Sequence, residues 1–146
     1  MANDVQKLLE HIAYNYIARQ EAIELERDAS ATEQGEDITA DKRRVVKQEE
    51  ERVEALGDPF RAGLRRADDA RRAGGNAISL DDRKPDENQQ ADALIHFLVR
   101  SQLATSTSRE TDQHRYIYTI AVDWDALDRV ARDAKVNLGT VLGNSG

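Results

Sequence analysis

Cysteine is missing from this chain, and its absence removes several classes of protein at once. Disulfide bonds, thiolate catalysis and cysteine-ligated zinc or iron–sulfur centres all require that side chain. The three histidines, His11, His96 and His114, stand far apart in the sequence, and none has a second ligand at metal-binding spacing. We therefore expect the protein to hold no metal and no cofactor.

Aromatic side chains are also scarce, at 5% of the 146 residues, whereas charged residues make up 34%. A chain of this length forms one ordinary domain, or a small domain with a helical extension. Because 39% of the residues are hydrophobic, we expect a core that is thin relative to the solvated helix surface. This composition favours an elongated or self-associating molecule.

Long hydrophobic runs are absent as well. The apolar pattern near the N-terminus is interrupted by Asp4, Lys7, Glu10 and His11, which fits neither a signal peptide nor a membrane span. We expect a cytoplasmic protein without a membrane segment. Its net charge of −7 opposes sequence-independent attraction to nucleic-acid phosphates, so binding to DNA requires a local basic surface.

Catalytic motifs are missing too. The chain has no GxSxG sequence, no phosphate-binding loop and no glycine-rich dinucleotide turn. Asp123 and Asp125 flank Trp124 as a catalytic carboxylate pair would. A helix that begins here explains both, because the first is its cap and the second lies in its first turn. We therefore expect that the protein is not an enzyme.

The first third of the sequence predicts a long amphipathic helix. Apolar residues recur at three- and four-residue steps from Val5 to Ile23, and Asn3 and Gln6 stand in capping-box spacing. This pattern predicts a helix to about residue 29. Small and polar residues over 29–37 then predict a connection.

Two further helices follow in the prediction. The first is capped by Thr39 and ends at Gly57, and the second begins at Pro59 and ends at Gly74. The earlier of the two has a narrow apolar seam that Glu49 interrupts. It packs either against the N-terminal helix or against another subunit, and the sequence leaves both alternatives open.

The last part of the chain predicts a helix and a β-hairpin. Asp86 and Gln89 stand in capping-box spacing at the start of a helix over 86–102. Alternating residues predict strands at 103–108 and 115–122, joined by a polar loop.

The hairpin leads directly into a closing helix. Asp123 is predicted to cap it, and Gly139 is predicted to end it. The spacing of Tyr116, Tyr118 and Trp124 places them where the hairpin and this helix share a core, rather than on a base-stacking surface.

These elements predict an α+β protein that is mainly helical. Long N-terminal helices, as a coiled coil or a helical hairpin, precede a domain with one antiparallel β-hairpin and a C-terminal helix. We divide the chain into a helical extension or dimerisation region at residues 1–57, a small domain at 58–142 and a frayed tail at 143–146.

The order of elements from residue 78 onward resembles the second half of a winged-helix domain. The resemblance is carried by ADALIHFLVRSQLATSTS followed by HRYIYTIAVDWDALDRVA, and it covers about 60 residues. It implies that the helix at 86–102 takes the position of a DNA-recognition helix and that the loop at 109–114 takes that of the wing tip.

One interval departs from the family pattern. The stretch from residue 78 to residue 91 is short for the extra helix that usually precedes the recognition helix. Either Leu80–Lys84 forms a single helical turn, or the helix beginning at Pro59 fills that place.

Candidate DNA contacts follow from the resemblance and from local charge. Asn88 and Gln89 can read adenine edges, although Asp86 and Glu87 beside them repel phosphates. The segment 61–72 has five arginines against two aspartates, a surplus of three positive charges, which either contact phosphate or form an ordinary solvated face. The candidate DNA contacts also include five arginines from this segment and two from the hairpin: Arg61, Arg65, Arg66, Arg71, Arg72, Arg109 and Arg115.

Two functions are consistent with these patterns. In the first, which analogy with the family favours, the chain is a non-catalytic DNA-associated protein, either a transcriptional regulator or an accessory factor, that forms homo-oligomers through its N-terminal helices. In the second, it is a protein-binding adaptor or structural assembly subunit that binds no nucleic acid. The acidic net charge and the acidic start of the helix at residue 86 favour this alternative.

Overall fold

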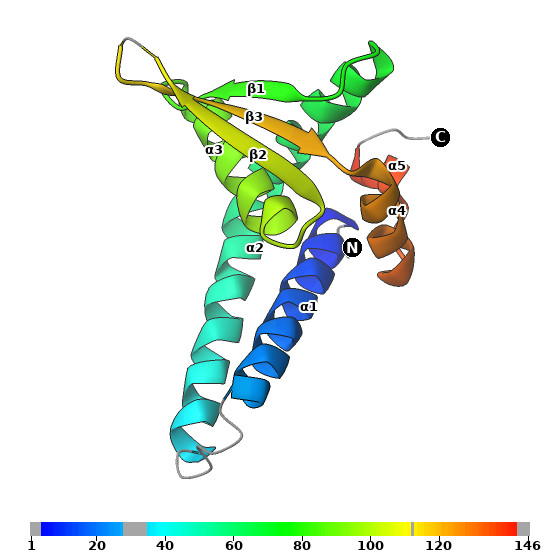
Figure 1. Ribbon diagram of the computed structural model, residues 1–146. Coiled ribbons are helices and arrows are strands. Elements are labelled where there is room, and N and C mark those ends of the chain that lie inside the picture. The colour runs from blue at the N-terminus through cyan, green and yellow to red at the C-terminus, as the bar shows by residue number, and fades with distance from the viewer. Residues whose placement is uncertain (1–3, 28–34, 112, 143–146) are drawn as a thin grey trace.

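The computed structural model describes residues 4–27, 35–111 and 113–142, and it is mainly helical with one small antiparallel sheet (Figure 1). The predicted α+β class is confirmed. The predictions for Asn3 and for the tail at 143–146 lie outside the described residues. In chain order the elements are α1 (Asp4–Arg27), α2 (Gly35–Arg72), β1 (Ile78–Asp81), α3 (Pro85–Leu94), the π-helix η2 (Ile95–Val99), β2 (Ala104–Glu110), β3 (Tyr116–Val122), α4 (Trp124–Asp133) and α5 (Leu138–Val141).

The helix α2 runs without interruption through the position where two helices were predicted to meet. Pro59 lies inside it, so the predicted end at Gly57 and the predicted new start at Pro59 are wrong. A proline in a helix interior removes one backbone hydrogen bond and costs about 3 kcal/mol. Burial offsets this cost, because Val53, Phe60 and Leu64 flank the proline on one face and are 3%, 0% and 0% exposed.

The start of α2 also differs from the prediction. The helix begins at Gly35, inside the predicted connection at 29–37, so Thr39 lies within the helix and not at its cap. α1 packs along α2, and the two form a helical hairpin (Figure 1).

The three strands lie in the order β1-β3-β2, and both pairings are antiparallel. The predicted hairpin is confirmed, with Ala104 of β2 opposite Val122 of β3. The stretch at 78–81, predicted only as extended, is a third strand that pairs with the other side of β3.

The aromatic residues of the hairpin are only partly in the core. Tyr118 and Trp124 are half-buried and pack against it. Tyr116 is 42% exposed, so its predicted burial is wrong. It lies opposite Glu110 at the loop end of the hairpin, where the sheet extends past α3 (Figure 1).

One helical segment, α3 continued by η2, lies between β1 and β2. It begins at Pro85 without a side-chain capping bond, so the predicted capping box of Asp86 and Gln89 is wrong. Proline suits the first helical position because it has no N–H to leave unpaired. Leu80 lies in β1 and the turn between β1 and α3 spans residues 82–84, so the predicted alternative of a helical turn at Leu80–Lys84 is wrong, and the other alternative, that the helix over 59–73 fills that place, stays a prediction.

The helix changes its hydrogen-bond pattern at η2. The Arg100 N–H donates to the Ile95 carbonyl, five residues earlier, at 3.0 Å. Such π-turns are rare and occur frequently at functional sites. The segment ends where Gln102 adopts a φ of 62°, in the left-handed region that closes many helices.

The C-terminal segment folds as two helices. The Asp123 carboxylate accepts the Ala126 N–H at 3.1 Å, so the predicted cap of α4 is confirmed. The predicted end at Gly139 is wrong, because α4 ends at Asp133 and a second cap, Asn137, starts α5. An asparagine followed by a leucine restarts the helix here because its side chain satisfies the first N–H groups.

A buried core joins these elements. It extends from Leu8 of α1 through Leu64 of α2 and Phe97 of η2 to Ile120 of β3 and Val141 of α5. Residues on both sides of position 57 contribute to it, and the predicted division of the chain at that position stays a prediction. Across the described ranges, no helix combines the length and the apolar character that crossing a bilayer requires.

Candidate functional site

Five of the nine predicted DNA contacts lie on the last turns of α2, and their side chains are exposed. Two of them bind one buried carboxylate. Asp68, which is 3% exposed, pairs with Arg71 and, at 3.1 Å, with Arg72. The Arg71 guanidinium also lies over the Trp124 ring, 3.9 Å from its centroid. Arg71 therefore connects the end of α2 to α4, whereas the pair between Arg72 and Asp68 lies within α2.

The other three arginines of α2 differ in their pairing. Arg66 pairs with Glu87 at 3.5 Å. Arg61 and Arg65 make no ion pair with any residue that the structure describes. The local surplus of positive charge predicted here is thus reduced to these two side chains.

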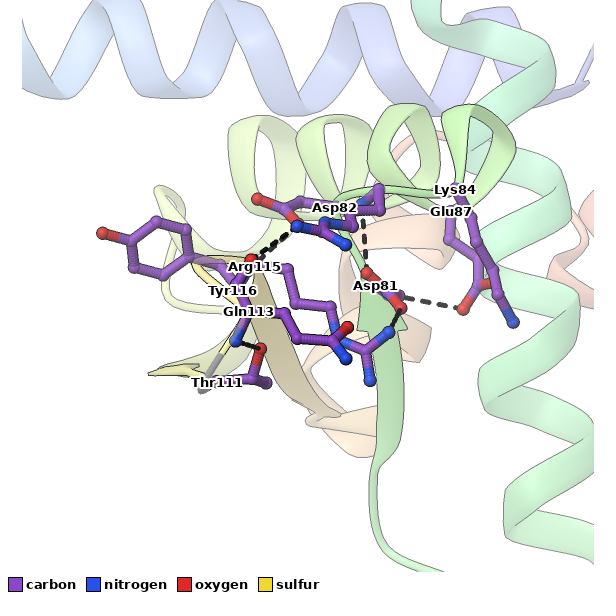
Figure 2. A network of polar contacts seen from close by, with 9 residues as sticks. Asp81, Asp82, Lys84, Glu87, Thr111, Gln113, Arg115 and Tyr116 are labelled. Carbon is purple, nitrogen blue, oxygen red and sulfur yellow. Dashed lines mark hydrogen bonds and ion pairs between the residues drawn. The ribbon is translucent and has the colours of Figure 1, made fainter.

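The start of α3 is enclosed on one side. Glu87 is 8% exposed and accepts the Asp81 backbone N–H at 3.4 Å and the Lys84 ammonium at 3.4 Å (Figure 2). Asn88 beside it is half-buried, and Gln89 is exposed. A groove-reading helix presents several adjacent side chains of its first turns to the bases, and here that surface is interrupted.

The hairpin loop is tied to the turn before α3. Arg115 pairs with Asp81 at 3.2 Å, and the Asp82 carboxylate accepts the Tyr116 N–H at 3.0 Å (Figure 2). Arg109 on β2 is exposed and has no ion pair in the described part of the chain. The predicted wing tip is therefore anchored at its base by charged contacts within the protein.

The structure brings Arg66 and Arg115 into one network and joins Arg71 and Arg72 at Asp68. Arg115 forms an ion pair with Asp81. The Asp81 backbone N–H donates to the Glu87 carboxylate, which forms an ion pair with Arg66. The carboxylates between these two arginines neutralise them. Of the nine predicted residues, Arg61, Arg65 and Arg109 are arginines without an ion pair in the described ranges, and they lie on two different elements.

A buried polar cluster that the sequence did not predict joins α2 to η2. The Glu49 carboxylate is 7% exposed. It accepts two hydrogen bonds from Arg100, at 3.0 and 3.1 Å, and one from His96 Nε2 at 3.0 Å. The Arg100 guanidinium lies over the Tyr16 ring of α1, 3.8 Å from its centroid. Three helical segments therefore meet at one carboxylate.

The charge states of this cluster follow from its surroundings. Burial alone would raise the pKa of Glu49, but the hydrogen bonds from Arg100 and His96 outweigh it, so the pKa is lowered. Burial lowers the pKa of His96 and the charge of Arg100 lowers it further, against the opposing hydrogen bond to Glu49. At neutral pH the cluster therefore contains a charged carboxylate, a charged guanidinium and a neutral imidazole that donates through Nε2.

A groove of about 620 Å³ opens beside the cluster, between α2 and the α3–η2 segment. Its apolar lining includes Leu56, Ile95 and Val99, which are half-buried. Arg52 lines its border and is exposed. Val45 lies on the same face of α2, seven residues before Arg52, and is 39% exposed. The apolar surface of the groove therefore continues along α2.

No group of three or more histidine, aspartate or glutamate side chains in the described ranges is arranged to hold a metal ion. Asp123 acts as a helix cap, as described above. The Glu49 carboxylate accepts three hydrogen bonds, whereas Arg100 Nε is buried without a hydrogen-bond partner, and the cluster is suited to fixing helices in place.

Comparison with known proteins gave no match to any family model, to any curated protein or to any solved structure.

Proposed function

We propose that the protein is a non-catalytic protein-binding adaptor or assembly subunit, which takes up a helical segment of its partner in the groove between α2 and η2. The observation that carries this proposal is the groove itself, with its volume of about 620 Å³ and its half-buried apolar side chains. Grooves of this kind receive the apolar face of an amphipathic helix.

The apolar side chains have the spacing that a docked helix requires. Val45 and Leu56 lie on one face of α2, and Ile95 and Val99 lie four residues apart on the facing segment. Two helices that pack side by side fill the space between them with such side chains, at interaxial distances of about 8–10 Å. A third helix laid along this face would remove these side chains from water.

Charge indicates the chemistry of the partner. Arg52 is exposed at the border of the groove and has no ion pair in the described part of the chain, whereas Arg100 is already bound by Glu49. An acidic side chain on the partner helix therefore finds one free guanidinium, and a basic side chain finds Asp92, which is exposed and also lines the groove. The Glu49 cluster supports the site by holding α2 and η2 at a fixed separation.

Selection of helical peptides from a displayed library, with the full chain as target, tests this function. Peptides with an apolar face and an acidic flank should bind the wild type and should lose binding to Leu56→Glu. Thr119→Glu, which adds the same charge on an exposed strand position, should retain it. If both variants bind alike, or if no helical peptide is recovered, the groove is not the docking surface.

DNA association is the second candidate, with the cytoplasm as the expected location of either function. It is supported by Arg61 and Arg65, which lie four residues apart on one exposed face of α2 and carry no ion pair within the described ranges. Binding to random duplex DNA should fall with salt, and Arg61→Gln/Arg65→Gln should reduce the slope of log K against log salt by about 2. Arg132→Gln, whose arginine pairs with Asp128, is the control. Absence of binding at low salt removes this candidate.

A further inference from the structure

One edge of the sheet is open. β2 is the outer strand on one side, and its register with β3 is continuous from Ala104 to Glu110. At the two ends of this ladder the Asp123 N–H donates to the Leu103 carbonyl and the Thr111 N–H donates to the Arg115 carbonyl. In an antiparallel ladder alternate residues face the neighbouring strand, so the odd-numbered residues of β2 face β3. Four residues therefore direct their N–H and C=O groups away from the sheet: Ala104, Ser106, Ser108 and Glu110.

The opposite edge, β1, is shorter and partly capped. β1 has four residues, and its even-numbered residues face β3, since the Asp82 N–H donates to the Tyr116 carbonyl. Of the odd-numbered residues that face outward, Asp81 donates its N–H to the buried Glu87 carboxylate. The β1 edge is thus short and partly capped by a side chain, as protected edges are.

The β2 edge is less protected, although Ala104 at its start is 6% exposed and its last two residues, Arg109 and Glu110, are charged. It is seven residues long, has neither proline nor lysine, and its register contains no bulge. Proteins usually guard an edge of this length, because its unpaired backbone groups form a template for another strand. Figure 1 shows β2 as the outermost strand, and the four outward-facing residues make no backbone hydrogen bond to any other described element.

We propose that this edge pairs with the β2 strand of a second copy of the chain, antiparallel and across a two-fold axis at Thr107. In this register all seven residues pair. Ser106 lies opposite Ser108 of the second copy, and Thr105 lies opposite Arg109 of the second copy. Each of the four outward-facing residues donates and accepts, which gives about eight N–H···O bonds and one continuous sheet of six strands.

The side chains select this register. No charged residue lies opposite a like charge, and the threonines and serines at the centre suit cross-strand pairs. A shift that puts Ser108 on the axis pairs five residues instead of seven and loses hydrogen bonds, and larger shifts in that direction place Arg109 opposite Arg109, or Glu110 opposite Glu110, which is unfavourable. Shifts toward the start of the strand put a residue before Thr107 on the axis. They pair fewer residues and therefore lose hydrogen bonds. This interface is separate from the groove at η2, so it does not depend on the function proposed above.

Sedimentation velocity of the full chain tests the proposal. The wild type should form a species of twice the 16.4 kDa chain mass, in a concentration-dependent manner. Thr107→Lys and Thr107→Glu should each be monomeric, because each places like charges face to face on the axis, and an equimolar mixture of the two should dimerise again. Thr119→Lys adds the same charge to the same open face one strand further in, and it should dimerise like the wild type.

A backbone variant gives a second measurement. Ser108→Pro removes an outward-facing N–H and no bond to β3, so it should yield a folded monomer, with an unchanged far-UV circular dichroism spectrum. If this variant does not fold, the two Thr107 variants decide the question. A wild type that is monomeric up to its solubility limit overturns the proposal. So does a dimer that persists in both Thr107 variants, since its interface then lies elsewhere.

Discussion

Replacing Glu49 by glutamine removes one negative charge and almost no volume from the point where α1, α2 and η2 meet. In the wild type the carboxylate accepts two hydrogen bonds from Arg100 and one from His96. A glutamine amide has one acceptor oxygen and therefore cannot satisfy the fork of Arg100 in the same way. The variant leaves a half-buried guanidinium without its counter-charge.

The magnitude follows from the burial of the two partners. Breaking a fully buried ion pair by removing one partner costs about 3–5 kcal/mol, and breaking an exposed pair costs about 0–1 kcal/mol. Glu49 is 7% exposed, but the Arg100 side chain is 24% exposed and keeps some contact with water. We therefore expect Glu49→Gln to lower the free energy of unfolding by about 2–3 kcal/mol.

Urea unfolding followed by far-UV circular dichroism measures this difference. Glu54→Gln, an exposed position five residues further along α2, is the matched control and should change the free energy of unfolding by less than about 0.5 kcal/mol. If Glu49→Gln is no more damaging than this control, the buried cluster does not hold the helices together. A double-mutant cycle with Arg100→Gln should show a coupling of at least about 1 kcal/mol.

Two further predictions concern pH and the glycines of α2. Because the folded state lowers the pKa of His96, the unfolded chain binds a proton that the folded chain does not, and stability should fall as the pH drops below the ordinary value of 6.5. In His96→Gln, the free energy of unfolding, measured with urea at several pH values, should decline less as the pH drops. An unchanged decline would contradict the lowered pKa of His96. A Cβ added at Gly57 meets no atom within 4 Å, so Gly57→Ala should stabilise the helix by about 0.5–1 kcal/mol. A Cβ added at Gly63 meets the Leu94 side chain at 3.0 Å. Gly63→Ala should therefore destabilise the protein, and thermal unfolding of the two variants should move in opposite directions.

The fold was predictable from the sequence where local signals agree with packing. The β-hairpin and the cap at Asp123 follow from alternation and capping, which act over a few residues. The break expected at Pro59 is absent because buried side chains on both sides of it stabilise one continuous helix. The π-turn at 95–99 has no sequence signal, since it differs from an α-turn by one hydrogen-bond step.

The candidate sites were harder to predict for a related reason. Glu49 interrupts an apolar seam, and its partners His96 and Arg100 are 47 and 51 residues away, so no local pattern connects them. The arginines of α2 are visible as a local excess of charge. Only the fold shows that Asp68 is buried beneath two of them. Counting charges along a segment therefore overestimates the surface that is free to bind phosphate.

The π-turn has a consequence for how this chain tolerates changes in length. A turn with one residue more than an α-helical turn is equivalent to a single-residue insertion, so deleting one residue within 95–99 lets the backbone close as a regular α-helix. Because the wider turn already accommodates the extra residue, the side chains after the deletion keep nearly the same angular position around the helix axis. Arg100 therefore stays on the side of Glu49, whereas a deletion in the regular part of α2 would rotate the side chains that follow it by about 100°.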